Sequence, residues 1–222
     1  MATATKIRGM AMTARNVPKV MSGEKTQTRR IESWLSRIDD IYDHVDKMFD
    51  EENGEVWFRF SVSDGDSTAY EDAKPRHQVG DRFYVKEALQ VALPEGNHAR
   101  YKTDNRIVMA GELPRKWQRD DGTPWKNSTI TARYMPKSAA RTFIKITDVR
   151  CERIQDISVD DIKAEGVTRF GELPHFPSYS ASREFWYYKD SFKHLWDETN
   201  GKGAWDRNDW TFAYTFELCE VV

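Results

Sequence analysis

Hydrophobic and polar residues alternate along several stretches of the chain, which is the pattern of half-buried β-strands. The clearest case is residues 55–62, where apolar side chains occupy every second position. In the longest case, residues 142–154, the apolar face changes between Ile146 and Val149, which indicates a bulge. The predicted strands are residues 7–14, 26–31, 55–62, 82–89, 142–154 and 212–218, with shorter possibilities at 99–103 and 106–110.

Apolar residues at three- and four-residue spacing predict two amphipathic helices, and end signals predict two shorter ones. The capping box is one such signal: Ser158 is followed by Asp161 three positions later. Glycines that end helices are the other signal. The predicted helices are residues 32–49 and 183–199, a short helix between Asn16 and Gly23, and another between Ser158 and Gly166.

Strands separated by helices of unequal length predict an α+β fold, in which a small curved or closed mixed β-barrel is flanked by helices. At 222 residues the chain is long for one domain and short for two, and we expect a single domain over residues 1–222. Residues 32–75 and 94–128 are predicted to be helical and loop insertions into it. Polar residues predict loops at 63–78 and 168–182.

The formal net charge of −2 excludes a protein that binds nucleic acid through a strong overall basic excess. It leaves room for a local basic pocket, which suits a small anionic or nucleoside-sized ligand. No apolar run approaches the roughly 20 residues that span a bilayer. The N-terminus lacks the apolar core of a signal peptide, so we expect a cytoplasmic protein without a membrane partner.

The cysteines and histidines give no indication of a metal centre. Cys151 and Cys219 lie in strand-like stretches without a CxxC partner, so two reduced, buried thiols are expected. The five histidines are scattered and form no HxH or HxxxH pair. The sequence therefore predicts no metal and no other cofactor.

Residues 23–30, with the sequence GEKTQTRR, hold three cations and two hydroxyl groups in eight positions. Composition alone favours a solvated turn that enters a strand. A ligand pocket is the alternative, because no other stretch of the chain groups so many hydrogen-bonding side chains.

Six blocks of sequence occur in an order that resembles a known family. They are GxKTxTxR at 23–30, GDRFYVKEA at 80–88, MPxxAAR at 135–141, ITDVRxERIQDIS at 146–158, AEGV at 164–167 and the C-terminal LW…W…NDW…F. Together they resemble the phage and prophage branch of the ASCH-domain family, within the PUA-like superfamily. The resemblance extends from about residue 7 to residue 218 and is weak over the two predicted insertions.

This resemblance implies a small β-barrel and a role in binding RNA or modified nucleobases. Small bacterial proteins similar to this one hydrolyse N4-acetylcytidine to cytidine and acetate with a Lys, a Thr and a Glu. The corresponding positions are Lys25, Thr28 and Glu165, the last by alignment over one short segment. Some ASCH proteins cleave RNA, so a ribonuclease is a further expectation from the family.

The chemistry of amide hydrolysis is compatible with these three residues. Thr28 could provide a nucleophilic hydroxyl, and Glu165 could either remove its proton or orient a water molecule. A charged Lys25 is better suited to stabilise an oxyanion than to act as a base. Because strand residues three apart face opposite ways, Lys25 and Thr28 can share a pocket only if Lys25 lies in the turn after Gly23 or a bulge intervenes, and we predict the turn.

Four other residues are candidates for ligand binding. Thr26 and Arg30 belong to the first block, and Arg30 could hold a phosphate or a base carbonyl, with a salt bridge as an equal alternative. Lys86 and Glu87 lie in the predicted strand at 82–89 and could line the pocket, although strand residues of this kind usually point to solvent.

Three functions therefore compete. The first is an amidohydrolase that removes an acyl group from an N4-acylated cytosine nucleoside or a related nucleobase. The second is a non-catalytic reader of RNA or modified nucleobases. The third is a ribonuclease, for which the chain offers neither a histidine pair nor a metal cluster. The expected partners are a nucleoside, a modified nucleobase or RNA.

Overall fold

The computed structural model describes residues 7–32, 35, 38, 42, 44–63, 65–91, 98–109, 129–168 and 181–220. They divide into two compact units, each built from separate stretches of the chain. Unit 1 comprises Met1–Gly23, Asp81–Lys145 and Glu217–Val222, and unit 2 comprises Glu24–Gly80 and Ile146–Phe216. The two units are described one at a time below, and the single domain over residues 1–222 stays a prediction.

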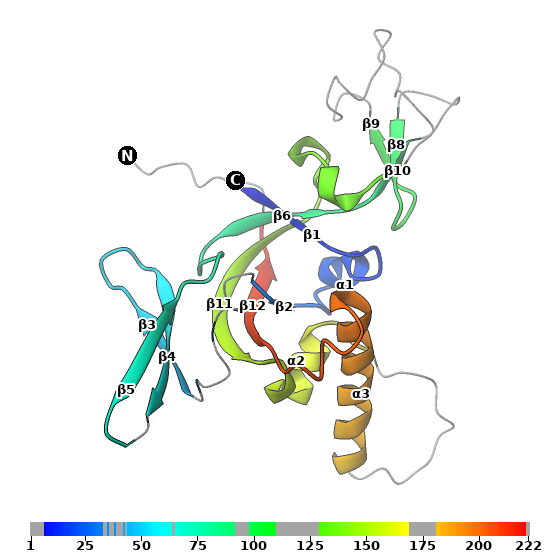
Figure 1. Ribbon diagram of the computed structural model, residues 1–222. Coiled ribbons are helices and arrows are strands. Elements are labelled where there is room, and N and C mark those ends of the chain that lie inside the picture. The colour runs from blue at the N-terminus through cyan, green and yellow to red at the C-terminus, as the bar shows by residue number, and fades with distance from the viewer. Residues whose placement is uncertain are drawn as a thin grey trace. The chain divides into compact units, whose positions relative to one another are not determined.

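Unit 1 contains a parallel strand pair and a small antiparallel sheet (Figure 1). Gly9 lies opposite Tyr84 in the parallel pair, and a Cβ atom there would come within 2.2 Å of the Lys86 side chain. The pair is β1 (Arg8–Ala11) and β6 (Arg82–Lys86), and β6 also pairs with the first residues of β11 (Phe143–Arg153). The antiparallel sheet has the order β10 (Thr129–Ile130), β7 (Leu89–Val91), β8 (His98–Tyr101), β9 (Ile107–Met109).

The small sheet of unit 1 packs its apolar side chains against two short 3-10 helices. These helices are η4 (Ala132–Tyr134) and η5 (Lys137–Ala139), and η5 lies within the MPxxAAR block at 135–141. The core of this region consists of Leu89, Ala99, Tyr101, Val108, Met135 and Ala139. The remaining helix of the unit is α1 (Val17–Met21).

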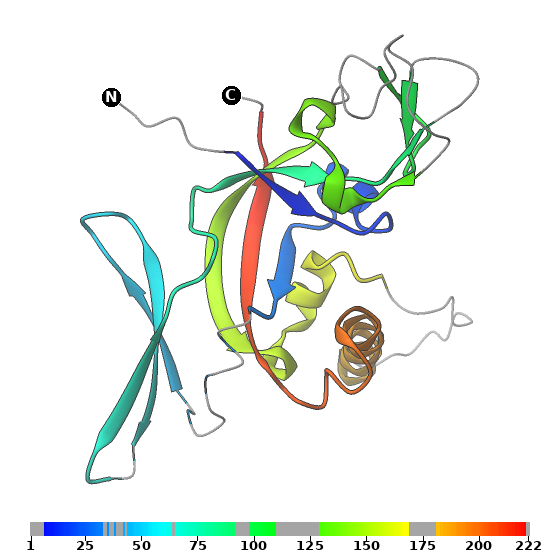
Figure 2. The same cartoon turned by 45° about the horizontal axis from the view of Figure 1, so that its top comes forward.

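Unit 2 combines a three-stranded meander with strands and helices from both ends of the chain (Figure 2). Thr28 lies opposite Tyr214 in the antiparallel pair of β2 (Gln27–Arg30) and β12 (Trp210–Leu218). The meander has the order β3 (His44–Phe49), β4 (Val56–Ser63), β5 (Thr68–Ala73). The helices are η6 (Ile154–Asp156), α2 (Val159–Ala164) and α3 (Ala181–Asn200).

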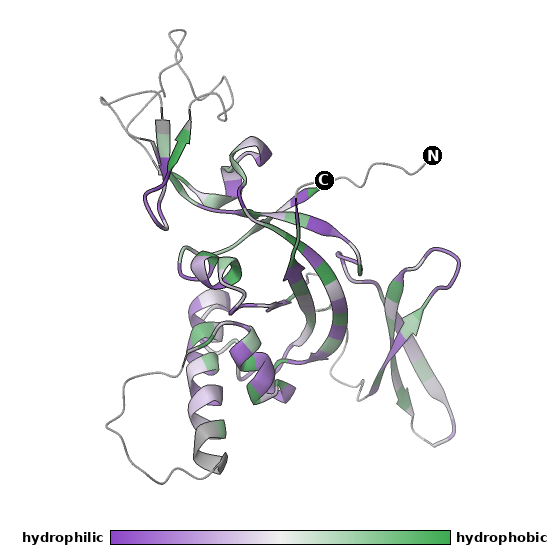
Figure 3. Ribbon diagram, turned by 180° about the vertical axis from the view of Figure 1, so that it is seen from behind, coloured by the Kyte–Doolittle hydropathy of each residue, from purple (hydrophilic) through white to green (hydrophobic). Residues whose placement is uncertain are grey.

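Two apolar clusters stabilise unit 2. One packs α2 against α3 and consists of Ile154, Ile157, Ile162, Phe192, Trp196, Ala204 and Trp205. The other joins the meander to β12, where the Phe58 and Phe212 rings lie 5.4 Å apart and those of Phe60 and Trp210 lie 4.9 Å apart. Figure 3 shows the alternation of hydrophilic and hydrophobic residues that places one face of β11 in a core.

The α+β class is confirmed, but a closed barrel is not found among the described residues. The strands of the largest sheet have the order β1-β6-β11-β12-β2, and no described pairing joins β1 to β2. The strand predictions at 55–62, 142–154 and 212–218 are confirmed, as is the long helix that begins near residue 183. The predicted strand at 82–89 is divided, because β6 ends at Lys86 and β7 begins at Leu89.

The predicted helix at 32–49 is wrong over its last six residues, which form strand β3, and most of its earlier residues lie outside the described ones. Val45, Lys47 and Phe49 lie opposite alternate residues of β4, and a turn closed by Asp50 returns the chain to that strand. Cross-strand pairing therefore overrides a local helical spacing. The loop predicted at 63–78 is wrong where β5 pairs with β4, and much of the insertion at 94–128 lies outside the described residues.

The local signals at helix ends and the cysteines give mixed outcomes. The Ser158 hydroxyl accepts a hydrogen bond from the Asp161 backbone N–H at 3.1 Å, as predicted. Asn16 precedes α1, but its side chain makes no capping hydrogen bond. Cys151 and Cys219 are free thiols, and only Cys151 is buried.

Candidate functional site

Lys25 lies in the turn between α1 and β2, as the sequence predicted. Gly23 adopts a φ of 77°, a left-handed conformation that releases the chain from the helix. The Thr26 N–H then donates to the Ala164 carbonyl at 2.8 Å, and its carbonyl accepts from the Phe216 N–H at 2.8 Å. These two hydrogen bonds fix the backbone next to Lys25 against α2 and β12.

Glu165 lies at the other side of the site, where α2 ends. Its backbone N–H donates to the Asp161 carbonyl at 2.8 Å, and Ile162 anchors the helix with a fully buried side chain. Gly166 follows with a φ of 77°, so the chain turns away directly after the carboxylate. The cap at Ser158 and the glycine stop therefore define the position of Glu165 from both ends of the helix.

Lys25 and Glu165 form a buried ion pair although 140 residues separate them. The Lys25 Nζ atom lies 2.6 Å from Glu165 Oε2 and 2.7 Å from the Glu165 carbonyl oxygen. Their side chains are 2% and 8% exposed. A second cation contacts the other oxygen of this carboxylate, since Arg29 Nη1 lies 3.3 Å from Glu165 Oε1.

Arg29 connects this pair to a wider polar network. Its Nε donates to Glu152 Oε1 at 2.9 Å, its Nη2 makes a further short contact with the same oxygen, and its Nη1 donates to Gln27 Oε1 at 2.7 Å. Gln27 in turn donates to Asp161 at 3.0 Å, and Arg150 donates to the same oxygen of Asp161 at 2.8 Å. Every buried charge in this network therefore has an opposite partner, as burial requires.

Burial and pairing shift the ionisation of two neighbours in this network. Burial alone would raise the pKa of the Asp161 carboxyl, but hydrogen bonds from Arg150 and Gln27 bring that pKa below its ordinary value. Burial lowers the pKa of the Arg30 guanidinium, and the charges of Glu165 and Tyr214 offset only part of that decrease. Contact with Arg150 therefore favours the charged form of the Asp161 carboxylate.

Thr28 is not joined to the pair. The neighbouring side chains of Gln27 and Arg29 both contact acids of α2, and successive residues of a strand point to opposite faces. Alternation therefore places Thr28 on the other face of β2 from Gln27 and Arg29, and no hydrogen bond among the described residues links its hydroxyl to Lys25 or Glu165. Lys25 contacts Glu165 as Arg29 does, and a pocket shared by Lys25 and Thr28 stays a prediction.

The four predicted ligand-binding residues lie in different environments. Thr26 contributes its backbone to the frame of the site, and Arg30 is half-buried, with the charges of Glu165 and Tyr214 acting on its guanidinium. Lys86 Nζ donates to the Arg133 carbonyl at 2.7 Å in unit 1. Glu87 is 1% exposed rather than solvated, and it accepts hydrogen bonds from Arg141 and Thr103. Ligand binding by these residues stays a prediction.

Sequence reasoning missed the residues that surround the pair. Arg29 occupies a variable position of the GxKTxTxR block, and Glu152 and Gln27 carried no role in the motif comparison. The available signal was alternation, because Lys25, Gln27 and Arg29 recur at every second position and can reach one side of the strand.

The described residues contain no group of three His, Cys, Asp or Glu side chains that could hold a metal ion. Among the helices of the described ranges, none has both the length and the apolar character needed to cross a membrane.

Comparisons with known proteins add little to this description. No family model matches the sequence, and a search of curated proteins found no match. A search of solved structures found a likeness to an ASCH domain from Lactobacillus crispatus JV V101, at 13% identity over 90% of this chain and 68% of that chain. Its TM-score is 0.31, which is too low to carry an argument about fold or function. Membership of the ASCH family therefore stays a prediction from the sequence blocks.

Proposed function

We propose that the protein is an amidohydrolase of the ASCH type that removes the acyl group from an N4-acylated cytosine nucleoside, with Lys25 and Glu165 as its reactive pair. The observation that carries this proposal is the buried contact of 2.6 Å between these two side chains. A cation and a carboxylate placed together provide the two functions that amide hydrolysis needs, which are oxyanion stabilisation and proton transfer.

Lys25 is suited to the oxyanion. An ammonium group has three N–H donors, and the contacts among the described residues use two of them. The third can donate to the acyl oxygen as negative charge develops on it. The hydrogen bonds of Lys25 to Glu165 hold the ammonium group in place, so little reorganisation accompanies the reaction.

Glu165 is suited to handle the proton of a water molecule. In the proposed reaction, water attacks the acyl carbon and transfers one proton to Glu165. The C–N4 bond then breaks, and Glu165 returns that proton to N4, which yields a carboxylic acid and the free cytosine amine. No hydrogen bond among the described residues links the Thr28 hydroxyl to either member of the pair, so we assign the nucleophile to water rather than to Thr28.

Hydrolysis of N4-acetylcytidine by the purified protein, followed as release of cytidine, tests the proposal. Lys25→Met and Glu165→Gln should each lower kcat by about 10²-fold or more, which is the usual contribution of a positioned acid, base or oxyanion donor. Thr28→Val should keep most of the activity, because valine preserves the shape of threonine. Absence of turnover by the wild-type protein would refute the proposal.

Folding controls accompany these variants, since each removes a buried charge. Circular dichroism and the thermal midpoint identify the fraction that is folded, and turnover is expressed per folded molecule. Loss of activity in Thr28→Val with trapping of an acyl group on Thr28 would instead return the nucleophile to that hydroxyl.

A reader of modified nucleobases or RNA is the second candidate. It is favoured by the full pairing of Glu165, whose two oxygens already accept hydrogen bonds from Lys25 and Arg29. A reader would show salt-dependent binding that weakens in Arg30→Ala, with no product formed. Equal, flat binding isotherms for RNA and for modified oligonucleotides would exclude it.

A further inference from the structure

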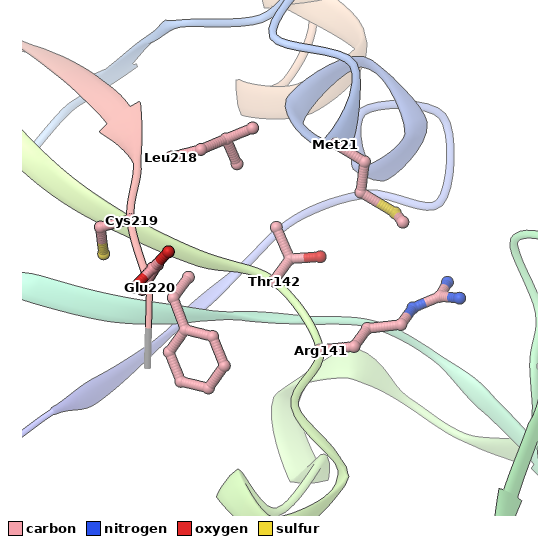
Figure 4. Close-up of a pocket in the computed structure, with 7 residues that line it drawn as sticks. Met21, Arg141, Thr142, Leu218, Cys219 and Glu220 are labelled. Carbon is pink, nitrogen blue, oxygen red and sulfur yellow. The ribbon is translucent and has the colours of Figure 1, made fainter. Parts of the chain in front are cut away.

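Unit 1 contains a cleft of about 440 Å³ whose lining includes neither Lys25 nor Glu165 (Figure 4). Its volume falls within the range of about 300–1,000 Å³ that is usual for small-molecule sites. It lies where α1 ends, where β11 begins and where β12 ends. The lining residues are Met21, Arg141, Thr142, Phe143, Leu218, Cys219 and Glu220.

The frame of this cleft is fixed by backbone hydrogen bonds. The Val85 N–H donates to the Thr142 carbonyl at 2.8 Å, and the Cys219 N–H donates to the Phe143 carbonyl at 3.0 Å. The side chains of Met21 and Leu218 form apolar parts of the lining, and Leu218 is 49% exposed. Exposed apolar side chains beside a cleft are a feature of ligand sites.

Arg141 forms a rigid polar wall of the cleft. Its guanidinium lies 3.7 Å from the centre of the Tyr101 ring and donates to Glu87 at 2.8 and 2.6 Å and to Asp104 at 2.7 Å. Contacts with the described residues use three of its five N–H donors, and the other two can serve a ligand. In Figure 4 the Thr142 hydroxyl points toward the side of the cleft where the Arg141 and Met21 side chains lie.

The charges around the cleft disfavour an anionic ligand. Glu87 and Asp104 already balance Arg141, and Glu220 adds a carboxylate to the lining. A phosphate or carboxylate would therefore gain little from Arg141 and would be repelled by Glu220. Burial raises the pKa of the Cys219 thiol, so this side chain contributes a neutral surface rather than a nucleophile.

We propose that this cleft binds an uncharged, planar heterocycle that carries a ring carbonyl. The ring is held between the Met21 and Leu218 side chains, since a thioether packs favourably against aromatic edges. Its carbonyl accepts hydrogen bonds from the Thr142 hydroxyl and from Arg141. The proposal rests on the cleft alone and is independent of the hydrolase activity proposed above.

Uridine and uridine 5′-monophosphate are the probes, because they share a carbonyl-bearing ring and differ in charge. The full chain is labelled with ¹³C at Met and Leu methyl groups and titrated with each compound by NMR. Uridine should shift the methyl signals of Met21 and Leu218 in a saturable way. The methyl signals of Met48 and Leu195, which belong to unit 2, report binding elsewhere and should stay constant.

Two matched variants test the hydrogen bond. Thr142→Val should weaken uridine binding about three- to tenfold, the equivalent of one neutral hydrogen bond. Thr147→Val makes the same change at an exposed position of β11 and should leave the affinity unchanged.

Three results would overturn the proposal. They are an absence of shifts at Met21 and Leu218 up to the solubility of uridine, equal affinity for the monophosphate, and equal affinity in Thr142→Val.

Discussion

Two buried carboxylates, Glu87 in unit 1 and Glu165 in unit 2, are held in different ways. Glu87 faces the planar fork of one arginine, since Arg141 Nε and Nη2 donate to its two oxygens at 2.8 and 2.6 Å. Glu165 is divided between two cations, because Lys25 contacts one oxygen and Arg29 the other. Both side chains are almost fully buried.

The difference lies in the geometry of the cation that holds each carboxylate. The planar guanidinium of Arg141 makes a bidentate pair with Glu87, and such a pair has a rigid geometry. Burial alone would lower the pKa of the Arg141 guanidinium, but its hydrogen bonds to Glu87 and Asp104 raise that pKa above its ordinary value. Lys25 is a compact ammonium group with one donor left for a substrate. Equal burial therefore corresponds to a structural role in unit 1 and to a proposed chemical role in unit 2.

Removal of the Glu87 carboxylate should produce the largest loss of stability. Glu87→Ala leaves the half-buried Arg141 with only Asp104 as a charged partner, and breaking a buried pair costs about 3–5 kcal/mol. Urea unfolding at neutral pH measures the change in the free energy of unfolding. A loss below about 1 kcal/mol, the value for surface pairs, would contradict the structural role.

A double-mutant cycle sharpens the description of the second pair. Lys25→Met and Glu165→Gln should show a coupling free energy of about 1–3 kcal/mol, because the two side chains are in direct contact. The cycle needs the unfolding free energies of the wild type, both single variants and the double variant. Additive effects would mean that the two residues do not interact in solution.

The cap of α2 should make a smaller contribution. Ser158→Ala removes the acceptor of the Asp161 N–H, which costs about 1 kcal/mol. Glu165 directly follows α2, so the variant should also lower kcat per folded molecule at the assay temperature. Ser158→Asp restores a capping acceptor and should recover both properties.

Replacement of Asp161 should have the smallest effect, a change in how the free energy of unfolding depends on pH below neutrality. The pKa of Asp161 is lowered in the folded protein, so this residue stabilises the fold above its unfolded pKa of about 4 and loses that effect as the pH falls through the lowered value. In Asp161→Asn the unfolding free energy should fall less steeply between neutral and acid pH. An unchanged slope would show that the ion contacts of Asp161 do not stabilise the protein.

Local patterns in the sequence predict much of the secondary structure and part of the site. Alternation identifies β4, β11 and β12, and end signals identify α2, because these features depend on neighbouring residues. The helix expected at 32–49 fails because strand β3 depends on its partner β4, which local spacing does not reveal.

Some residues of the site could likewise be assigned from the sequence, and others depend on tertiary contacts. The resemblance paired Lys25 with Glu165, and the structure brings the two into contact. Arg29 could not be assigned in advance, because its role depends on Glu152 and Glu165, which lie more than 120 positions away along the chain. The orientation of Thr28 likewise depends on which face of β2 meets α2, and only the tertiary structure decides that.

The central claim is that Glu165 does chemistry and Glu87 maintains structure. It is tested most directly by measuring kcat for hydrolysis of N4-acetylcytidine in Glu165→Gln and Glu87→Gln, each expressed per folded molecule. The account predicts a loss of about 10²-fold or more in Glu165→Gln and retained turnover in Glu87→Gln, despite its lower stability. Retained turnover in Glu165→Gln, or an equal loss in both variants, would contradict it.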